Sequence, residues 1–194
     1  SEDSIRESRI IFHQDETDLI NRLHCKSSEK MDEIPDGSIH LVATSPPYNV
    51  TKDYDENLKL TDHLDFLERV FTEVYKKMAD GGRVCINIAN LGRKPYIPMH
   101  SHIINIMDKI GYLMRGEIIW EKGVTSGVSC AWGSWKSASN PVLRDSHEYI
   151  LVYSKGNFSR KRENGENTIT REEFLEYTKS IWTFPTVSAK KACH

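Results

Sequence analysis

One apolar stretch, residues 39–43, ends abruptly in two consecutive prolines, and this combination restricts the fold more than any other feature of the sequence. A near-continuous apolar run of this length predicts a strand buried on both faces, as in the parallel sheet of an α/β protein. The residues that follow are Thr44-Ser45-Pro46-Pro47-Tyr48. In open α/β sheets ligands bind beyond the carboxyl ends of the strands, so this corner is a candidate ligand site.

The chemistry of the corner favours recognition of an aromatic amine. Each proline fixes its own φ and restricts the residue before it, so the corner is rigid. Neither proline has an N–H group, and the Ser45 hydroxyl can accept or donate a hydrogen bond. Tyr48 adds a flat ring. We therefore expect acceptors that bind the amino group of an aromatic amine in its plane, beside a ring on which the face of that amine can stack.

The remaining periodicity predicts alternating strands and helices. The expected strands are residues 9–13, 39–43, 83–89, 113–120 and 149–153. The expected helices are residues 18–23 as one or two turns, a helix capped by Thr61 or Asp62 and running to about Met78, and residues 100–110. Strands joined by helices predict an α/β sandwich with parallel strands, whereas the last two strands lack an intervening helix and are expected to form an antiparallel pair.

Each long predicted helix has one apolar face and a glycine signal after it. In the first helix the inward residues are expected to be Leu64, Leu67, Val70, Phe71, Val74 and Tyr75, and Asp80-Gly81-Gly82 is expected to end it. In the second they are expected to be Ile103, Ile104, Met107 and Ile110, with Gly111 closing it.

Composition is that of a soluble globular protein with one domain. The chain has 194 residues, a net charge of −2 and no apolar run as long as a membrane span, so we expect neither a strongly basic nucleic-acid binder nor a membrane protein. The charged start, SEDSIRESR, is unlike a signal peptide. Four widely separated cysteines indicate no zinc site and suit a reducing cytosol, so a cytoplasmic location is expected.

Two segments interrupt the strand–helix alternation. Residues 123–146 are rich in Gly, Ser and Trp, and residues 156–170 are polar and expected to be a flexible surface loop. Trp132 and Trp135 either pack within their loop or take part in target recognition, with Lys136 and Arg144 on phosphates. The basic cluster Arg160-Lys161-Arg162 either touches a phosphate backbone or is simply solvated.

The corner resembles the catalytic motif of the amino-group DNA methyltransferases, [DNS]-P-P-[YFW], in the serine version of the cytosine-N4 branch. Other segments are similar to further blocks of that family, in matching order. They are His13-Gln14-Asp15 to Ser38-Ile39-His40-Leu41, Asp80-Gly81-Gly82-Arg83, Gly111-Tyr112 with Ile118 to Lys122, Ala131 to Trp135, Asn140-Pro141 and Arg144 to Tyr149.

The resemblance implies a function and a set of site residues. It implies transfer of a methyl group from S-adenosylmethionine to an exocyclic amino group of a flipped base in double-stranded DNA, in a restriction–modification system. The catalytic residues implied are Ser45, Pro46, Pro47 and Tyr48. Thr44, Ser45 and Pro46 would contact the cofactor. Asn49, Trp132, Trp135, Lys136 and Arg144 would contact DNA.

One family element is missing from the sequence. Members bind S-adenosylmethionine through an F-x-G-x-G-type loop, which in the permuted order would follow the catalytic motif, and no such loop is present. The resemblance therefore implies a single partial domain over residues 1–194, the N-terminal half of a Rossmann-like three-layer sandwich. A second chain would carry the glycine loop, unless that half has been truncated.

Three alternatives stay open. The target base could be adenine, methylated at N6, because the residue before the prolines predicts the base imperfectly. The chain could also be a non-catalytic DNA-binding subunit, since the cofactor loop is absent. His147-Glu148 could suggest a metal or acid–base pair, but no second ligand set accompanies it, and we favour a structural role near a strand start.

Overall fold

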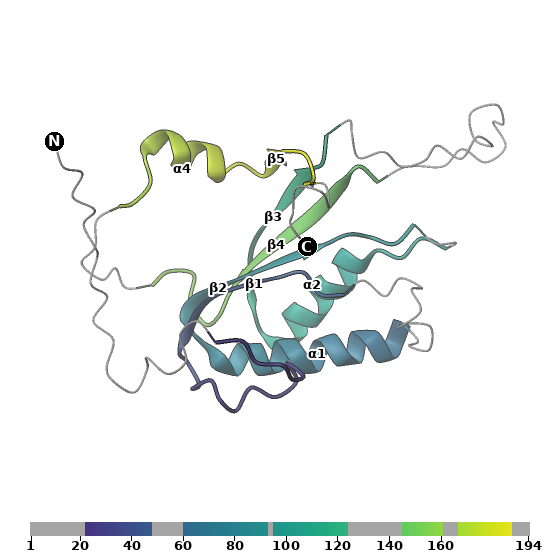
Figure 1. Ribbon diagram of the computed structural model, residues 1–194, viewed down its shortest axis with the longest axis vertical. Coiled ribbons are helices and arrows are strands. Elements are labelled where there is room, and N and C mark those ends of the chain that lie inside the picture. Colours follow the sequence, from purple (N-terminus) through teal and green to yellow (C-terminus); the bar gives the residue numbers. More distant parts are fainter. Residues whose placement is uncertain (1–21, 48–59, 93–94, 124–144, 161–166, 188–194) are drawn as a thin grey trace.

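The computed structural model describes residues 22–47, 60–92, 95–123, 145–160 and 167–187. Within them a five-stranded sheet has the strand order β1-β2-β4-β3-β5 (Figure 1). Its strands are β1 (Ile39–Thr44), β2 (Met78–Ile88), β3 (Leu113–Glu121), β4 (His147–Ser154) and β5 (Ile181–Thr183). The helices are α1 (Leu60–Lys77), α2 (Met99–Ile110) and α4 (Arg171–Tyr177).

The sheet is mixed, with a single reversed strand. β1 pairs with β2 in parallel, and β3 pairs with β5 in parallel. β4 lies between β2 and β3 and is antiparallel to both, so β1, β2, β3 and β5 all point the same way. The expected antiparallel pair of the last two strands is confirmed as β3 and β4. The expectation of parallel strands holds for β1, β2 and β3, the other described strands that the sequence predicts.

The core lies between one face of the sheet and the two long helices. Alternate residues of β2 and β4 are buried with residues of α1 and α2, and Figure 1 shows both helices on the same side of the sheet. The inward faces of both helices are as predicted, with Leu67, Phe71, Ile103 and Met107 at most 2% exposed. Gly111 closes α2 with a φ of 101°, which favours glycine.

The prediction that the first strand is buried on both faces is wrong for the described structure. Leu41 is 63% exposed, and β1 lies at one edge of the described sheet. The side chains of β1 and β2 that face away from α1 and α2, such as Leu41 and Cys85, are covered by no described helix. The second helical layer of the expected sandwich is therefore not among the described residues, and the predicted incompleteness stays a prediction.

The predicted cap and stop signal of the first helix are also wrong, although its last residue, Lys77, adjoins the predicted end at Met78. α1 begins at Leu60, so Thr61 and Asp62 lie in its first turn rather than at the cap. It ends at Lys77 because Met78 already pairs with Ile39, and the glycine pair falls inside β2. Gly81 has a φ of 73°, and a Cβ there would lie 2.6 Å from Arg160 Cγ, so this glycine allows residues 158–160 to approach β2.

The structure differs from the sequence-based prediction at residues 22–23 and in the region after β4. Arg22 and Leu23, expected to end a helical turn, are not helical, while residues 9–13 and 18–21 lie outside the described residues. Residues 156–160 and 167–170 form an exposed loop, as predicted. Two elements after it were not predicted. They are α4, which begins with a capping box between Thr170 and Glu173, and the short strand β5.

Candidate active site

The carboxyl ends of four strands meet at one edge of the sheet, because β1, β2, β3 and β5 are parallel. Ser45 follows β1, Asn90 follows β2, Lys122 follows β3 and Phe184 follows β5. β4 begins at the same edge, since His147 pairs with Glu121. This edge is the ligand-binding position of open α/β sheets, so the structure places the diproline corner where chemistry is expected.

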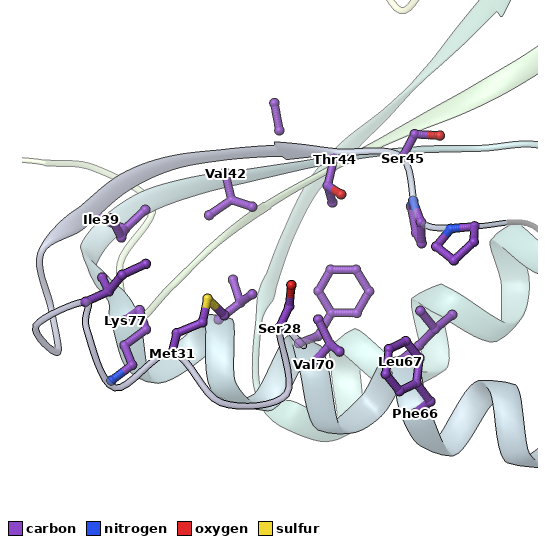
Figure 2. Close-up of a pocket in the computed structure, with 16 residues that line it drawn as sticks. Ser28, Met31, Ile39, Val42, Thr44, Ser45, Phe66, Leu67, Val70 and Lys77 are labelled. Atoms are coloured by element: carbon purple, nitrogen blue, oxygen red, sulfur yellow. The ribbon is translucent and has the colours of Figure 1, made fainter. Parts of the chain in front are cut away.

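The corner separates the two hydroxyl groups that precede the prolines. Ser45 is exposed and Pro46 is buried. Because side chains alternate along a strand, Thr44 points toward α1 and Ser45 points to the opposite side, as Figure 2 shows. Ser45 is thus accessible at the carboxyl edge, whereas the Thr44 hydroxyl faces the helical layer. Pro46 anchors the corner in the packed side of the molecule.

A cavity of about 470 Å³ lies behind the corner, between β1, α1 and the preceding loop. Figure 2 shows Val42, Thr44, Phe66 and Val70 directed into it. Its lining is mostly aliphatic and aromatic, with few polar atoms to bind an amino group. Ser45 also borders this space, although its side chain points to the other side in Figure 2, so the cavity lies on the packed side of the corner.

A buried polar network joins three strands at the carboxyl edge. Glu148 is 8% exposed, and its carboxylate forms an ion pair with Lys122 at the end of β3. The Asn87 side-chain amide of β2 donates a hydrogen bond of 2.6 Å to the same carboxylate. Lys122 also donates its backbone N–H to Ser146 O at 3.0 Å. Glu148 therefore holds β2, β3 and β4 together, which agrees with the structural role favoured from sequence.

The loop after β2 carries a second polar group that sequence reasoning missed. Asn90 Oδ1 accepts a hydrogen bond from the backbone N–H of His100 at 3.1 Å and lies 2.8 Å from His100 Nδ1. It thereby caps α2, whose own N-cap, Pro98, makes no side-chain cap bond. The His100 ring stacks on Tyr149 with centroids 4.2 Å apart. Burial lowers the pKa of His100 below its usual 6.5, so the ring is neutral at pH 7.

An aromatic group lies at the ends of β3 and β5. The Trp120 and Phe184 rings stack with centroids 4.9 Å apart, and Trp120 Nε1 donates to Phe184 O at 3.0 Å. The Lys122 ammonium lies 5.7 Å from the centroid of the Trp120 ring. Trp120 and Lys122, both in the family-like segment Ile118 to Lys122, thus link β5 to the Glu148 network. β5 was not predicted, although the apolar and aromatic residues of the segment Ile181 to Phe184 could have indicated a strand.

Other expected site residues are not brought to this edge or are not described. Arg160 packs over Gly81, near the start of the β1–β2 pairing and therefore toward the opposite end of the strands from Ser45. The remaining candidates lie outside the described residues. They are Tyr48, Asn49, Trp132, Trp135, Lys136 and Arg144. The described residues also contain no helix that is both long and apolar enough to span a bilayer.

Strand order, helical layer and site edge together define a Rossmann-like methyltransferase fold. The solved structure of TTHA0409 from Thermus thermophilus, provisionally assigned as a DNA modification methylase, superposes with a TM-score of 0.66 at 27% identity. That match covers 84% of this chain and 66% of TTHA0409. The same protein complexed with S-adenosyl-L-methionine gives a TM-score of 0.61 at 28% identity, over 78% of this chain and 65% of TTHA0409.

Residues 39–192 match the N6/N4 DNA methylase family, and the chain belongs to that family of S-adenosylmethionine-dependent methyltransferases. It is 36% identical to the type II methyltransferase M.MjaVI of Methanocaldococcus jannaschii, over 82% of this chain and 83% of that protein. It is 30% identical to M.MjaI of the same organism, over 80% of this chain and 63% of that protein. The chain thus spans most of one relative and less than two thirds of another.

Proposed function

We propose that this chain is the catalytic part of a site-specific DNA methyltransferase that modifies the N4 amino group of cytosine. The observation that carries the proposal is the exposure of Ser45 on a rigid diproline corner at the carboxyl edge of the sheet. Family membership supplies the reaction class, methylation of an amino group in DNA. The serine before the prolines favours cytosine by resemblance, and adenine-N6 is the alternative.

The corner would activate the amino group of the target base. Such a nitrogen is a weak nucleophile because its lone pair is delocalised into the ring. The Ser45 hydroxyl and the Pro46 carbonyl would each accept a hydrogen bond from one of its N–H groups and draw the nitrogen toward tetrahedral geometry, which localises the lone pair. Transfer of the methyl group would break its bond to sulfur, form the bond to nitrogen and release one of the two amino protons. Positioning and electrostatics would provide most of the acceleration.

The base must leave the duplex before the corner can reach it. Extrusion costs a few kcal/mol, of which stacking on Tyr48 would return about 1–3 kcal/mol. Asn49 would shape the turn or touch the base. Trp132, Trp135, Lys136 and Arg144 would contact DNA, the last two through phosphates. The buried Glu148–Lys122 pair lies between the two ends of the 123–146 segment and would hold them together.

S-adenosylmethionine would supply the methyl group as an electrophilic sulfonium. The described residues fit one wall of its site, because Ser45 presents an exposed hydroxyl beside Pro46 at the edge where the family binds ligands. Thr44 fits less well, since its side chain faces the α1 side, so its contact would come from the backbone. The glycine loop expected to bind the rest of the cofactor would come from another segment or a second chain.

A methylation assay tests the proposal. The chain is incubated with duplex DNA and labelled S-adenosylmethionine, alone and together with the glycine-loop half of a related methyltransferase. Methylation that requires the added half supports a divided domain, and mass analysis of the product nucleoside separates cytosine from adenine. DNA binding without methylation under either condition would instead favour the non-catalytic subunit.

A matched pair of serine variants tests the site itself. Ser45→Ala should lower the rate of methylation about 100-fold, the usual effect of losing one preorganised polar contact in a transition state. Ser28→Ala is the control, because Ser28 lines the cavity on the packed side of the corner. Equal activity of both variants would remove Ser45 from the mechanism.

A further inference from the structure

Three arginine side chains converge at the amino ends of β1, β2 and β3, and we refer to Arg83, Arg115 and Arg160 as the arginine cluster. Arg83 Nη2 and Arg115 Nη1 both donate to the Phe158 carbonyl oxygen, at 2.6 and 2.7 Å. Arg160 lies beside them, with its Nη2 at 3.4 Å from His40 Nε2 on β1. The shared acceptor holds two guanidinium groups in one small volume, with the third at its side.

No carboxylate among the described residues forms an ion pair with the arginine cluster. Burial, together with the charges of Arg115 and Arg160, lowers the pKa of Arg83. The carboxylate closest to Arg83 in sequence, Asp80, lies against Gly156, where an added Cβ would be 3.0 Å from its Oδ1. Arginine does not lose its proton in proteins, and like charges packed this closely repel one another. The cluster therefore has the chemistry of an anion-binding site.

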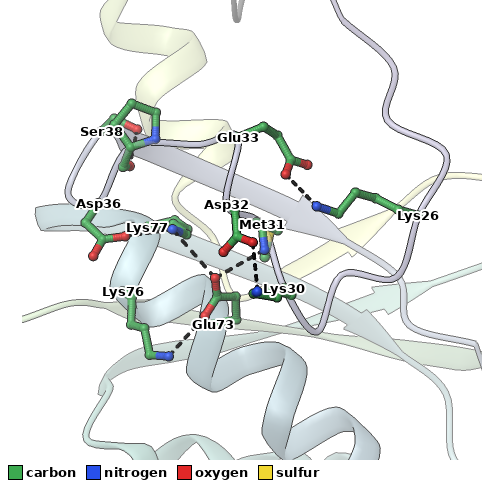
Figure 3. Close-up of polar contacts among 11 residues, drawn as sticks. Lys26, Lys30, Met31, Asp32, Glu33, Asp36, Ser38, Glu73, Lys76 and Lys77 are labelled. Atoms are coloured by element: carbon green, nitrogen blue, oxygen red, sulfur yellow. Dashed lines mark hydrogen bonds and ion pairs between the residues drawn. The ribbon is translucent and has the colours of Figure 1, made fainter.

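The lysines at the end of α1, on the other side of the sheet, are balanced by carboxylates. Lys77 pairs with Asp36 at 2.7 Å and lies 3.6 Å from Glu73 (Figure 3). Lys76 pairs with the same Glu73 at 3.1 Å. The described chain thus supplies carboxylates to these cations and not to the arginine cluster, which leaves the cluster available to a partner.

The arginine cluster lies at one end of an apolar sheet surface, which we call the open face. Arg83 and Cys85 point away from α1 and α2, because side chains alternate along β2. Leu41 and Val152 pair with these two residues and share their side of the sheet. Leu41 is 63% exposed, α1 and α2 lie on the other side (Figure 1), and no residue of α4 is buried. Sheets of this type are normally covered on both faces by protein.

The combination of apolar and basic surface favours a protein partner over nucleic acid. DNA would supply phosphates to the arginines, but it offers no apolar face to Leu41 and Val152. An amphipathic helix with an acidic side chain near one end would match both parts, since a carboxylate forms paired hydrogen bonds with a guanidinium group. Relatives contain more chain from which such a helix could come, because this chain spans 63% of M.MjaI and 66% of TTHA0409.

We propose that a helix of the glycine-loop half packs on the open face and that its carboxylate binds between Arg83, Arg115 and Arg160. The inference rests on the proposed divided domain and names the contact that sets how the two halves meet. Ser45 follows Leu41 by four residues, so the cluster lies about 13 Å along the strand from the corner. A helix of roughly nine residues covers that distance. The acidic anchor at one end therefore positions the helix relative to Ser45 at the other end.

Association of the two halves tests the proposal. The full chain is mixed with the labelled glycine-loop half of a related methyltransferase, without DNA or S-adenosylmethionine, and the Kd is measured by fluorescence anisotropy. Arg115→Gln and Arg160→Gln should each raise the Kd about tenfold, because each removes a charge-assisted hydrogen bond. Arg69→Gln is the matched control, since it removes the same charge from α1, and it should leave the Kd unchanged. Failure of the wild-type chain to associate, or one Kd for all variants, would overturn the proposal.

The stability of the chain alone distinguishes a docking site from a structural cluster. A docking site predicts that Arg160→Gln leaves the urea midpoint unchanged or raises it, because one of three like charges is removed. A lower midpoint would make Arg160 a structural part of the chain and would overturn the proposal.

Two further outcomes separate the docking contact from DNA binding and from the proposed activity. If the chain alone binds duplex DNA and Arg160→Gln abolishes this binding, the cluster contacts phosphates and the proposal fails. Arginine-dependent association of the halves, without methylation once DNA and S-adenosylmethionine are added, would support the docking contact and contradict the proposed function. Methylation by a mixture whose association ignores the arginines would do the reverse.

Discussion

The Lys122 ammonium forms an ion pair with the Glu148 carboxylate where β3 ends and β4 begins. The pair is largely removed from water, with side chains 20% and 11% exposed. Removing the cation leaves a buried carboxylate, and Lys122→Met should cost about 3 kcal/mol of unfolding free energy. The double variant with Glu148→Gln should cost less than Lys122→Met alone. Urea denaturation measures both, and additive losses would show that the charges are not coupled.

Two glycines with the same backbone conformation should differ in their response to substitution. Gly81 and Gly37 have φ values of 73° and 71°, but a Cβ meets Ser159 O at 2.8 Å in the first case and nothing within 4 Å in the second. Gly37→Ala should cost about 1 kcal/mol from backbone strain. Gly81→Ala should cost about 1–3 kcal/mol more because of overpacking. Equal urea midpoints would mean that residues 158–160 do not pack against β2.

Two buried tyrosines should respond oppositely to loss of the hydroxyl. Tyr112 Oη donates to Phe71 O at 2.9 Å, whereas Tyr153 Oη has no hydrogen-bond partner in the described part of the chain. Burial raises the pKa of both phenols, so both are neutral. Tyr112→Phe should destabilise the protein by about 1 kcal/mol, and Tyr153→Phe should be neutral or stabilising. Thermal unfolding of the two variants measures the difference.

Glu73 should make stability fall in mild acid. Its hydrogen bond from the Met31 N–H and its contact with Lys76 lower its pKa from the usual 4.5. A carboxyl group whose pKa is lowered by folding stabilises the fold above pH 4.5, and this contribution is lost as pH falls through the folded-state pKa. Glu73→Gln should therefore flatten the pH dependence of unfolding below pH 4.5.

Tyr48 should affect methylation and leave folding intact. Loss of base stacking in Tyr48→Ala should lower kcat/KM by about 5- to 150-fold, the equivalent of 1–3 kcal/mol. Tyr48→Phe keeps the ring and should retain most of the activity. The assay uses the chain supplied with a glycine-loop half, and thermal unfolding checks the fold. Wild-type turnover by the alanine variant would eliminate the stacking role.

The elements predicted correctly are those with strong local periodicity. The apolar faces of α1 and α2 repeat every three to four residues, and β1, β3 and β4 are bounded by polar residues or glycine. The predicted cap of α1 was wrong because residues such as Thr61 and Asp62 can either cap a helix or occupy its first turn. α4 was not predicted, although its capping box, Thr170 with Glu173, is visible in the sequence, because a helix of 7 residues is too short to show a clear apolar periodicity.

What could not be predicted depends on contacts between distant residues. The position of Ser45 followed from a strand end, but the Glu148 network requires Asn87 and Lys122 from other strands. Asn90 as the cap of α2 likewise depends on a loop approaching the helix from outside. Local spacing contains no information on such pairings.

The reversed strand β4 has a consequence for how the protein is made. β2 and β3 are synthesised first, yet their facing edges have no partner until residues 147–154 leave the ribosome. Pairings such as Arg83 with Ser154 close long loops, which slows folding and leaves strand edges open to association with other chains. A nascent chain arrested shortly before β4 should therefore be the form most prone to aggregate, and the form on which chaperones act.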